Sequence, residues 1–241
     1  MELLKHERRS TGPVSNNGPK SWRVRLVWTG VVVLVLIGLA AATRRALVLL
    51  FGIGASPVTQ ALDAGFARHP VLTLVHIVPG AMLMALGPFQ FVPAIRAHRL
   101  WRHRWSGRLF VAAGYLVGVS ALTMSWRMSI GGANETAATT LFAIAFLFAL
   151  TKGFWHIRHR EIRQHREWMI RAFAIGLGVA AIRPIVGAFF AVGRLAPQEF
   201  FGIAFWLGFT LTAIAAEVWI QLTRTEVRVA EERALLGVER R

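Results

Sequence analysis

The amino-acid sequence predicts an all-α integral membrane protein, a bundle of six transmembrane helices with both termini on the cytoplasmic side. Of its 241 residues, 55% are hydrophobic and only 17% are charged, whereas a soluble domain is about 45–50% apolar and about 25% charged. The apolar residues form long runs, and a helix needs about 20 such residues to cross the hydrocarbon core of a bilayer. Because lipid offers no partners to backbone N–H and C=O groups, each run should be helical.

Six runs are long enough to span a bilayer, and the first and fourth are the shortest. They extend from Leu26 to Ala42, Val71 to Pro93, Leu109 to Met128, Thr136 to Thr151, Met169 to Gly193 and Phe200 to Leu222. The basic start and the run Ala40-Ala41-Ala42 imitate a cleavable secretory signal. Both the basic region and the apolar stretch are longer than a signal requires, which favours an uncleaved anchor.

Lys and Arg residues orient these spans. Twenty-two of the 28 lie before span one, after span six, or between spans two and three and spans four and five. Cytoplasmic segments carry such an excess. We therefore expect a disordered basic tail over residues 1–23, a transmembrane domain over 24–222 and a charged cytoplasmic tail over 223–241. The formal net charge of +16 is then a topology signal, and the partner it implies is the lipid bilayer and not nucleic acid.

Several chemistries are excluded by residues that the chain lacks. The absence of cysteine excludes a disulfide framework, a Cys-ligated zinc, an iron–sulfur cluster and a thiolate nucleophile. No Gly-rich phosphate loop, Gly-x-Ser-x-Gly or His-Glu-x-x-His motif is present. Asp63 is the only aspartate and falls in the predicted outer loop between spans one and two, so paired-aspartate chemistry is excluded as well.

The two long cytoplasmic loops end alike. His103-Arg104-Trp105-Ser106-Gly107-Arg108 leads into span three, and His165-Arg166-Glu167-Trp168-Met169-Ile170-Arg171 leads into span five. Spans two–three and four–five would then be two hairpins of one type in the same orientation, a parallel repeat. Trp and Arg both anchor helices at the membrane interface, which explains part of the similarity but leaves the paired histidines unexplained.

These motifs also carry a family resemblance. Together with His69-Pro70, His76-Ile77-x-x-Gly80 and Leu86-Gly87-Pro88-Phe89-Gln90-Phe91, they resemble the bacterial membrane family known as domain of unknown function 2306. The resemblance covers roughly His69 to Glu217. It implies a multi-pass helical protein, which we place in the cytoplasmic membrane, and it implies no activity, cofactor or catalytic residue.

Polar residues at membrane depth are the candidate functional residues, because an ionisable group costs at least ~2.5–3.5 kcal/mol at the centre of a span. An outer layer would hold His76 and Arg183. An inner layer would hold Gln90, His103, Arg108, His165, Arg171 and Glu217.

Each of these residues also has a purely structural interpretation. His76 would hydrogen-bond a neighbouring helix, Arg183 would bind carbonyls freed by Pro184, and Glu217 would pair with Arg108 or Arg171.

Helical periodicity adds two expectations about faces. His76, Gly80 and Gly87 share one face of span two, where glycine would let another helix or a flat ligand approach closely. In span six the polar side chains share a face that should point into the bundle: Trp206, Thr210, Glu217 and Gln221.

Three classes of function follow, and the first is electron transfer by a b-type haem. His103 and His165 would be its ligands, with Arg108 and Arg171 pairing with the propionates and His76 serving a second site or a proton relay. Both ligands lie at helix entries, and His76 has no deep histidine partner, which weakens this hypothesis. A non-haem metal site is disfavoured because acids are few.

The other two classes need no chromophore. A proton-coupled carrier would use His76, Arg183 and Glu217, with Pro184 as a break point, and so small a carrier would oligomerise. A non-catalytic assembly factor or partner subunit would use its polar residues only for helix packing. Of the three, haem binding is the leading specific hypothesis, with the inner-layer histidines and arginines as the expected functional centre; the carrier and the partner subunit are the alternatives.

Overall fold

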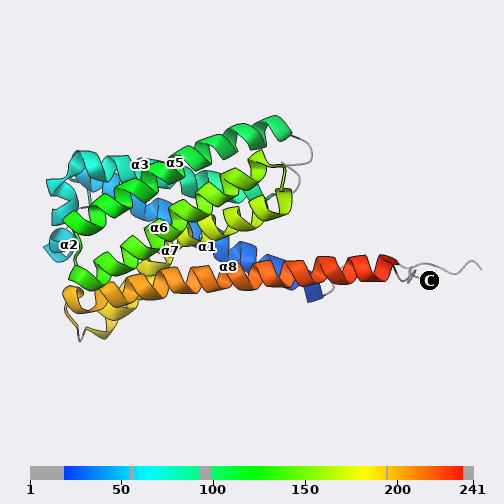
Figure 1. The fold of residues 1–241 in the computed structure, drawn as a ribbon. Coiled ribbons are helices and arrows are strands. Elements are labelled where there is room, and N and C mark those ends of the chain that lie inside the picture. Colours follow the sequence, from blue (N-terminus) through cyan, green and yellow to red (C-terminus); the bar gives the residue numbers. More distant parts are fainter. Residues whose placement is uncertain (1–18, 55–56, 93–98, 194, 236–241) are drawn as a thin grey trace, which may run out of the picture.

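The computed structural model confirms the helical membrane architecture. It describes residues 19–54, 57–92, 99–193 and 195–235, and every regular element in these ranges is a helix. They are α1 (Pro19–Phe51), α2 (Pro57–Arg68), α3 (Pro70–Phe91), α5 (Leu100–Arg127), α6 (Gly132–Arg158), α7 (Ile162–Val192) and α8 (Pro197–Leu235). All except α2 are long and apolar enough to cross a membrane, so the six predicted spans are present (Figure 1).

Local sequence signals set several helix ends. Four of the helices begin at a proline, namely Pro19, Pro57, Pro70 and Pro197, which fits because the first turn leaves its N–H groups unbonded anyway. At the other end of α7, Gly193 adopts a left-handed conformation with φ of 65°, and its N–H bonds the carbonyl of Phe189 at 3.1 Å. This is the glycine cap that commonly ends a helix.

The helices extend well beyond the apolar runs. Hydropathy places the start of span three at Leu109 and that of span five at Met169, but α5 begins at Leu100 and α7 at Ile162. Hydropathy detects only the part of a helix in hydrocarbon, whereas Arg and Trp continue it through the interface. His103 and His165 therefore lie inside helices. The predicted C-terminal tail over 223–241 likewise continues α8 as far as Leu235. Residues 1–18 and 236–241 of the two predicted tails lie outside the described residues.

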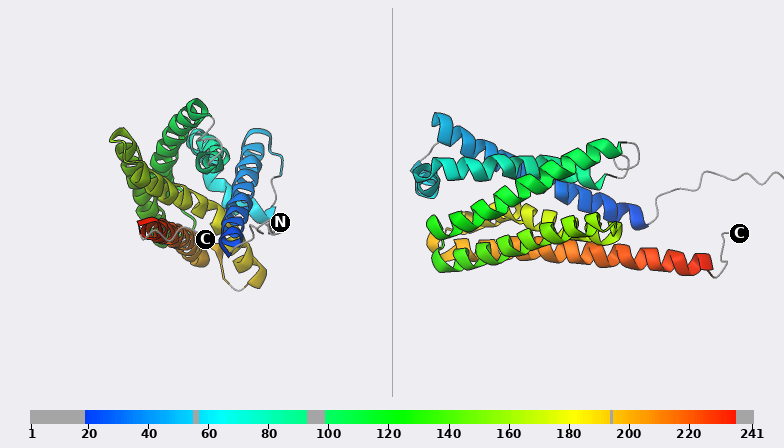
Figure 2. Two further views of the ribbon diagram at one scale, coloured as in Figure 1. Left: turned by 90° about the vertical axis from the view of Figure 1, so that its right-hand side faces the viewer. Right: turned by 45° about the horizontal axis from the view of Figure 1, so that its top comes forward.

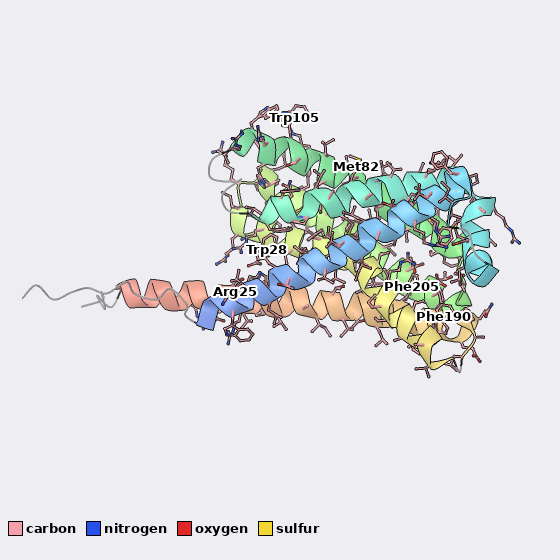
Figure 3. The ribbon with its side chains drawn as sticks, turned by 180° about the vertical axis from the view of Figure 1, so that it is seen from behind. Arg25, Trp28, Met82, Trp105, Phe190 and Phe205 are labelled. Carbon is pink, nitrogen blue, oxygen red and sulfur yellow. The ribbon has the colours of Figure 1, made fainter. Side chains whose placement is uncertain are left out.

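The central helix of the bundle is α7. It packs mainly on α8 and α6 and also contacts α1 and α3, while α3 and α5 form a neighbouring pair. Helix α1 begins and helix α8 ends at the same end of the bundle, which we call the terminal end. Helix α2 lies at the opposite end, which we call the α2 end (Figure 2). Arg25 and Trp105 mark the terminal end in Figure 3. Which end faces the cytoplasm, and the parallel repeat, remain predictions.

Small residues bring α7 and α8 together. A side chain added at Gly208 of α8 would place Cβ 3.1 Å from both the carbonyl oxygen of Gly178 and the backbone nitrogen of Ile182 on α7. Gly178 faces Phe209 equally closely. Helices in a bilayer gain no hydrophobic drive from meeting each other, so close backbone approach of this kind holds them together.

The prediction for the face of span six holds for only part of the face. Trp206 is half-buried and donates to Asn134 Oδ1 on α6 at 2.9 Å. Thr210 and Gln221 are exposed and Glu217 is only half-buried. The face that packs inward carries mostly apolar and small side chains: Phe201, Ala204, Gly208, Phe209, Thr212, Ala216 and Ile220. In lipid a polar stripe does not have to be buried in the bundle when it lies near the interface, and packing of small residues decides the face instead.

Candidate functional site: a cavity at the α2 end

The predicted inner-layer residues are engaged in contacts between helices. Gln90 donates from Nε2 to Ser106 Oγ at 2.7 Å, which joins α3 to α5. His165 donates from Nδ1 to the carbonyl of Gly153 at 2.8 Å, which joins α7 to α6. Such bonds are what a packing role requires.

Arg171 and Glu217 form the ion pair that their depth suggested. Arg171 donates from Nε and Nη2 to the two carboxylate oxygens at 2.9 and 3.1 Å, and its guanidinium lies 4.8 Å from the centre of the Trp168 ring. The alternative partner Arg108 instead lies over Trp105, 5.2 Å from the ring centre. Glu217 is thus explained by helix pairing.

We expect a double-mutant cycle on this ion pair to give a coupling energy of about 0.5–1 kcal/mol. The side chains of Arg171 and Glu217 remain 23% and 45% exposed, so water competes with the pair. The cycle compares Arg171→Gln, Glu217→Gln and the double variant by thermal unfolding in one detergent. A coupling near zero would show that the bidentate contact adds nothing to stability.

Haem binding gains no support from this arrangement. His103 lies on α5, which packs mainly on α3 and α6, whereas His165 lies on α7, which packs mainly on α6 and α8. In the ranges that the structure describes, no three His, Asp or Glu side chains gather as metal ligands would. The ligand roles of His103 and His165, and the propionate roles of Arg108 and Arg171, remain predictions.

The two outer-layer residues do meet. His76 and Arg183 line one partly open cavity of about 340 Å³ at the α2 end, with residues of α1, α3, α5, α6, α7 and α8 and Phe66 of α2 in its lining. Phe205 of α8, labelled in Figure 3, belongs to its wall. A cavity of this size lies within the range of small-molecule sites.

Arg183 is the main polar group of this cavity. It follows Ile182, which is almost fully buried on α7, whereas Arg183 keeps exposed surface and lines the cavity. None of the described residues accepts a hydrogen bond from its guanidinium or forms an ion pair with it. The expectation that carbonyls freed by Pro184 would hold Arg183 was therefore wrong, because none of the described carbonyls accepts a hydrogen bond from it. Its five N–H donors have no hydrogen-bond partner among the described residues.

His76 serves both the packing and the cavity. Its Nδ1 lies 2.9 Å from Ser120 Oγ on α5, and the hydroxyl of Ser120 donates to the carbonyl of Leu116. The hydroxyl oxygen therefore accepts from Nδ1–H, which leaves Nε2 as a neutral acceptor. The predicted bond to a neighbouring helix is confirmed, and the ring also lines the cavity.

The two glycines on the His76 face of α3 have different roles. A Cβ at Gly87 would overlap the ring of Phe173 on α7, so this glycine admits another helix. A Cβ at Gly80 would meet only Val117 Cγ2, at 3.9 Å, and Gly80 lines the cavity. On this face of α3, Gly87 thus allows close approach of a helix, whereas Gly80 leaves open space beside His76.

The arginines of α1 were missed as site residues. Arg44 and Arg45 fall beyond the apolar run of span one, yet α1 continues through them and both line the cavity. Asp63, expected in a loop, lies buried on α2 and pairs with both: Arg44 Nη2 donates to Oδ2 at 3.0 Å, and Arg45 Nη1 donates to Oδ1. The guanidinium of Arg45 also stacks 3.7 Å from the ring centre of Phe66. The available signal was the single aspartate soon after two adjacent arginines.

Glu135 was missed as well. Its Oε2 accepts from the backbone N–H groups of Ile130 and Gly131 at 2.7 and 2.6 Å, so this buried carboxylate stabilises the start of α6. It lines the cavity and acts on Arg183 through its charge alone. Three guanidinium groups therefore face two carboxylates at this end of the cavity, which leaves one positive charge unbalanced among the described groups.

Comparison with known families agrees with the motifs. The sequence model of the DUF2306 predicted membrane proteins matches residues 73–220, more than half of the chain. The chain belongs to this family. The matched region contains His76, Glu135 and Arg183, whereas Arg44, Arg45 and Asp63 precede it. No curated protein and no solved structure shows significant similarity to the chain.

Proposed function

We propose that the protein binds a small anionic molecule inside the membrane and belongs functionally with the carriers. The observation that carries this proposal is the guanidinium of Arg183, which faces a cavity and has no hydrogen-bond or ion-pair partner among the described residues. Of the three classes that the sequence left open, a carrier is the one that needs such a group. Electron transfer by haem and a pure packing role do not.

The energetics support an anionic ligand. An arginine within a span is unfavourable unless a partner or water compensates its charge, and residues of this kind mark substrate pathways. Arg44 and Arg45 share Asp63 as an ion-pair partner, and Glu135 bonds two backbone N–H groups. Arg183 is left for a ligand. A guanidinium binds a carboxylate or phosphate through two parallel N–H···O bonds.

The lack of native cysteine permits a clean test by single-cysteine labelling. Thr139 lines the cavity, so Thr139→Cys should react with water-soluble methanethiosulfonates. We expect the anionic ethylsulfonate reagent to react about 10-fold faster than the cationic ethyltrimethylammonium reagent, each rate being divided by its rate with a free thiol, because the net positive charge concentrates anions. Mass spectrometry of the purified protein measures both rates.

Thr210→Cys is the matched control. Thr210 is exposed on α8 and does not line the cavity, so it should face lipid and react with neither reagent. Equal normalised rates at Thr139→Cys, or a preference for the cation, would refute an anion site. Applied to intact cells and to inverted vesicles, the same reagent also tests the proposed topology, since the α2 end should be labelled only from outside the cell.

A further inference from the structure

The charged and the apolar residues that line the cavity lie at opposite ends of it. Arg183, His76 and Glu135 lie toward the α2 end, whereas residues closer to the terminal end of the same helices are apolar. On α7 the lining continues from Arg183 through Val179 to Ile175, a distance of about 12 Å at 1.5 Å per residue. The lower wall is completed by Leu83, Met84, Phe146 and Phe209. The cavity thus has a charged head region and an apolar floor.

A small inorganic anion matches only the head region. It would satisfy Arg183 but leave the floor empty, and apolar cavities stay dry because water finds no hydrogen-bond partners in them. An unfilled void also forfeits the dispersion contacts of its lining. A ligand that fills the whole space must therefore carry an apolar body as well as a charge.

The volume and the net charge of the cavity further restrict the class of ligand. The space of about 340 Å³ lies within the range of small-molecule sites, so it can hold a ligand that has both a charged group and an alkyl chain. The unbalanced charge is a single positive one, and His76 presents an acceptor that offers nothing to a second anionic oxygen. A monoanion is therefore favoured over a phosphate monoester, which carries about −1.5 to −2 at neutral pH.

We infer that the ligand is a single-chain amphiphile with a monoanionic head, a medium-chain carboxylate such as octanoate being the simplest case. This inference rests on the proposed function, because it assigns the class of molecule to the same cavity. The carboxylate bonds Arg183, and the alkyl chain passes Gly80 toward Leu83 and Phe146. Glycine at position 80 is then what keeps the path from head to floor open.

Protection of Thr139→Cys from the anionic reagent tests the inference in lipid nanodiscs, at equal free aqueous concentrations of each probe. Burial of one CH₂ strengthens binding roughly fourfold. We therefore expect the half-protecting concentration to fall at least ~10-fold from butanoate to octanoate. Octylammonium should not protect, and octyl phosphate should protect less than octanoate.

A second variant distinguishes binding of the ligand's alkyl chain from binding of its carboxylate. A Cβ at Gly80 meets only Val117 Cγ2, at 3.9 Å, and Gly80 lines the cavity, so we expect Gly80→Leu to occupy cavity space. The gain from butanoate to octanoate should then disappear while protection by butanoate remains. Gly30→Leu is the matched control, since a Cβ at Gly30 meets nothing within 4 Å and Gly30 does not line the cavity. In this variant the half-protecting concentrations of butanoate and octanoate should be unchanged.

The outcomes separate the inference from the proposed function. If the anionic reagent is preferred but butanoate and octanoate protect equally, the cavity binds small anions and the amphiphile inference is overturned. If octyl phosphate protects better than octanoate, the monoanion assignment fails. If the reagents show no charge preference at all, the proposed function fails, and the inference fails with it.

Discussion

Replacing Arg183 by methionine should make the protein more stable and abolish the anion preference of the cavity. The guanidinium lacks a hydrogen-bond or ion-pair partner among the described residues. Because Arg183 lies within a predicted membrane span, the folded protein holds this charge away from bulk water without a compensating contact. Removing an uncompensated charge of this kind should raise the free energy of unfolding by about 1–2 kcal/mol. In the Thr139→Cys background, the rate advantage of the anionic reagent should fall about 10-fold.

Arg45→Met is the control for the stability measurement. Arg45 lines the same cavity, but it pairs with Asp63 and stacks on Phe66, so its removal leaves a buried carboxylate with fewer partners and should destabilise. Thermal unfolding of both variants in one detergent, without added ligand, gives the comparison. A loss of stability in Arg183→Met equal to that in Arg45→Met would show that Arg183 serves packing and not a ligand.

Gly208→Val should be among the most destabilising single substitutions in the chain. Its Cβ would lie 3.1 Å from backbone atoms of Gly178 and Ile182, and backbone cannot move aside as the end of a flexible side chain does. The two helices must separate along the contact that joins α8 to the central helix. We expect a loss of about 3 kcal/mol or more in the free energy of unfolding, the upper end of what overpacking costs.

Gly187→Val provides the matched comparison on α7. A Cβ at Gly187 meets nothing within 4 Å, so this variant carries the same change of side chain and helix propensity without the clash. Its melting temperature should stay close to that of the native protein, while Gly208→Val should melt far lower or fail to purify as a monodisperse species. Equal effects of the two variants would refute close packing of α7 against α8 at Gly208.

Membrane spans could be predicted because the signal is carried by each segment alone. A run such as Val71 to Pro93 must be helical and must span, whatever packs beside it, since lipid imposes both conditions. The pairing of Glu217 with Arg171 was also within reach, because both lie near the same end of their helices and few acids compete. The motifs around His76 and His103 likewise indicated the family, which the match over residues 73–220 confirms.

The sequence could not predict which helices pack against each other, and the candidate site depends on that packing. The sequence alone determined six spans and the family. It placed His76 and Arg183 in one layer but favoured the inner-layer histidines and arginines as the functional centre. Only the tertiary structure decided that α7 is central and that Gly80 borders the cavity while the space at Gly87 is filled by Phe173. It also decided that Arg44 and Arg45 of α1 line the cavity and pair with Asp63 of α2. The physical reason is that a span's hydropathy records its contact with lipid, whereas a cavity arises from which side chains of different helices fail to fill the space between them.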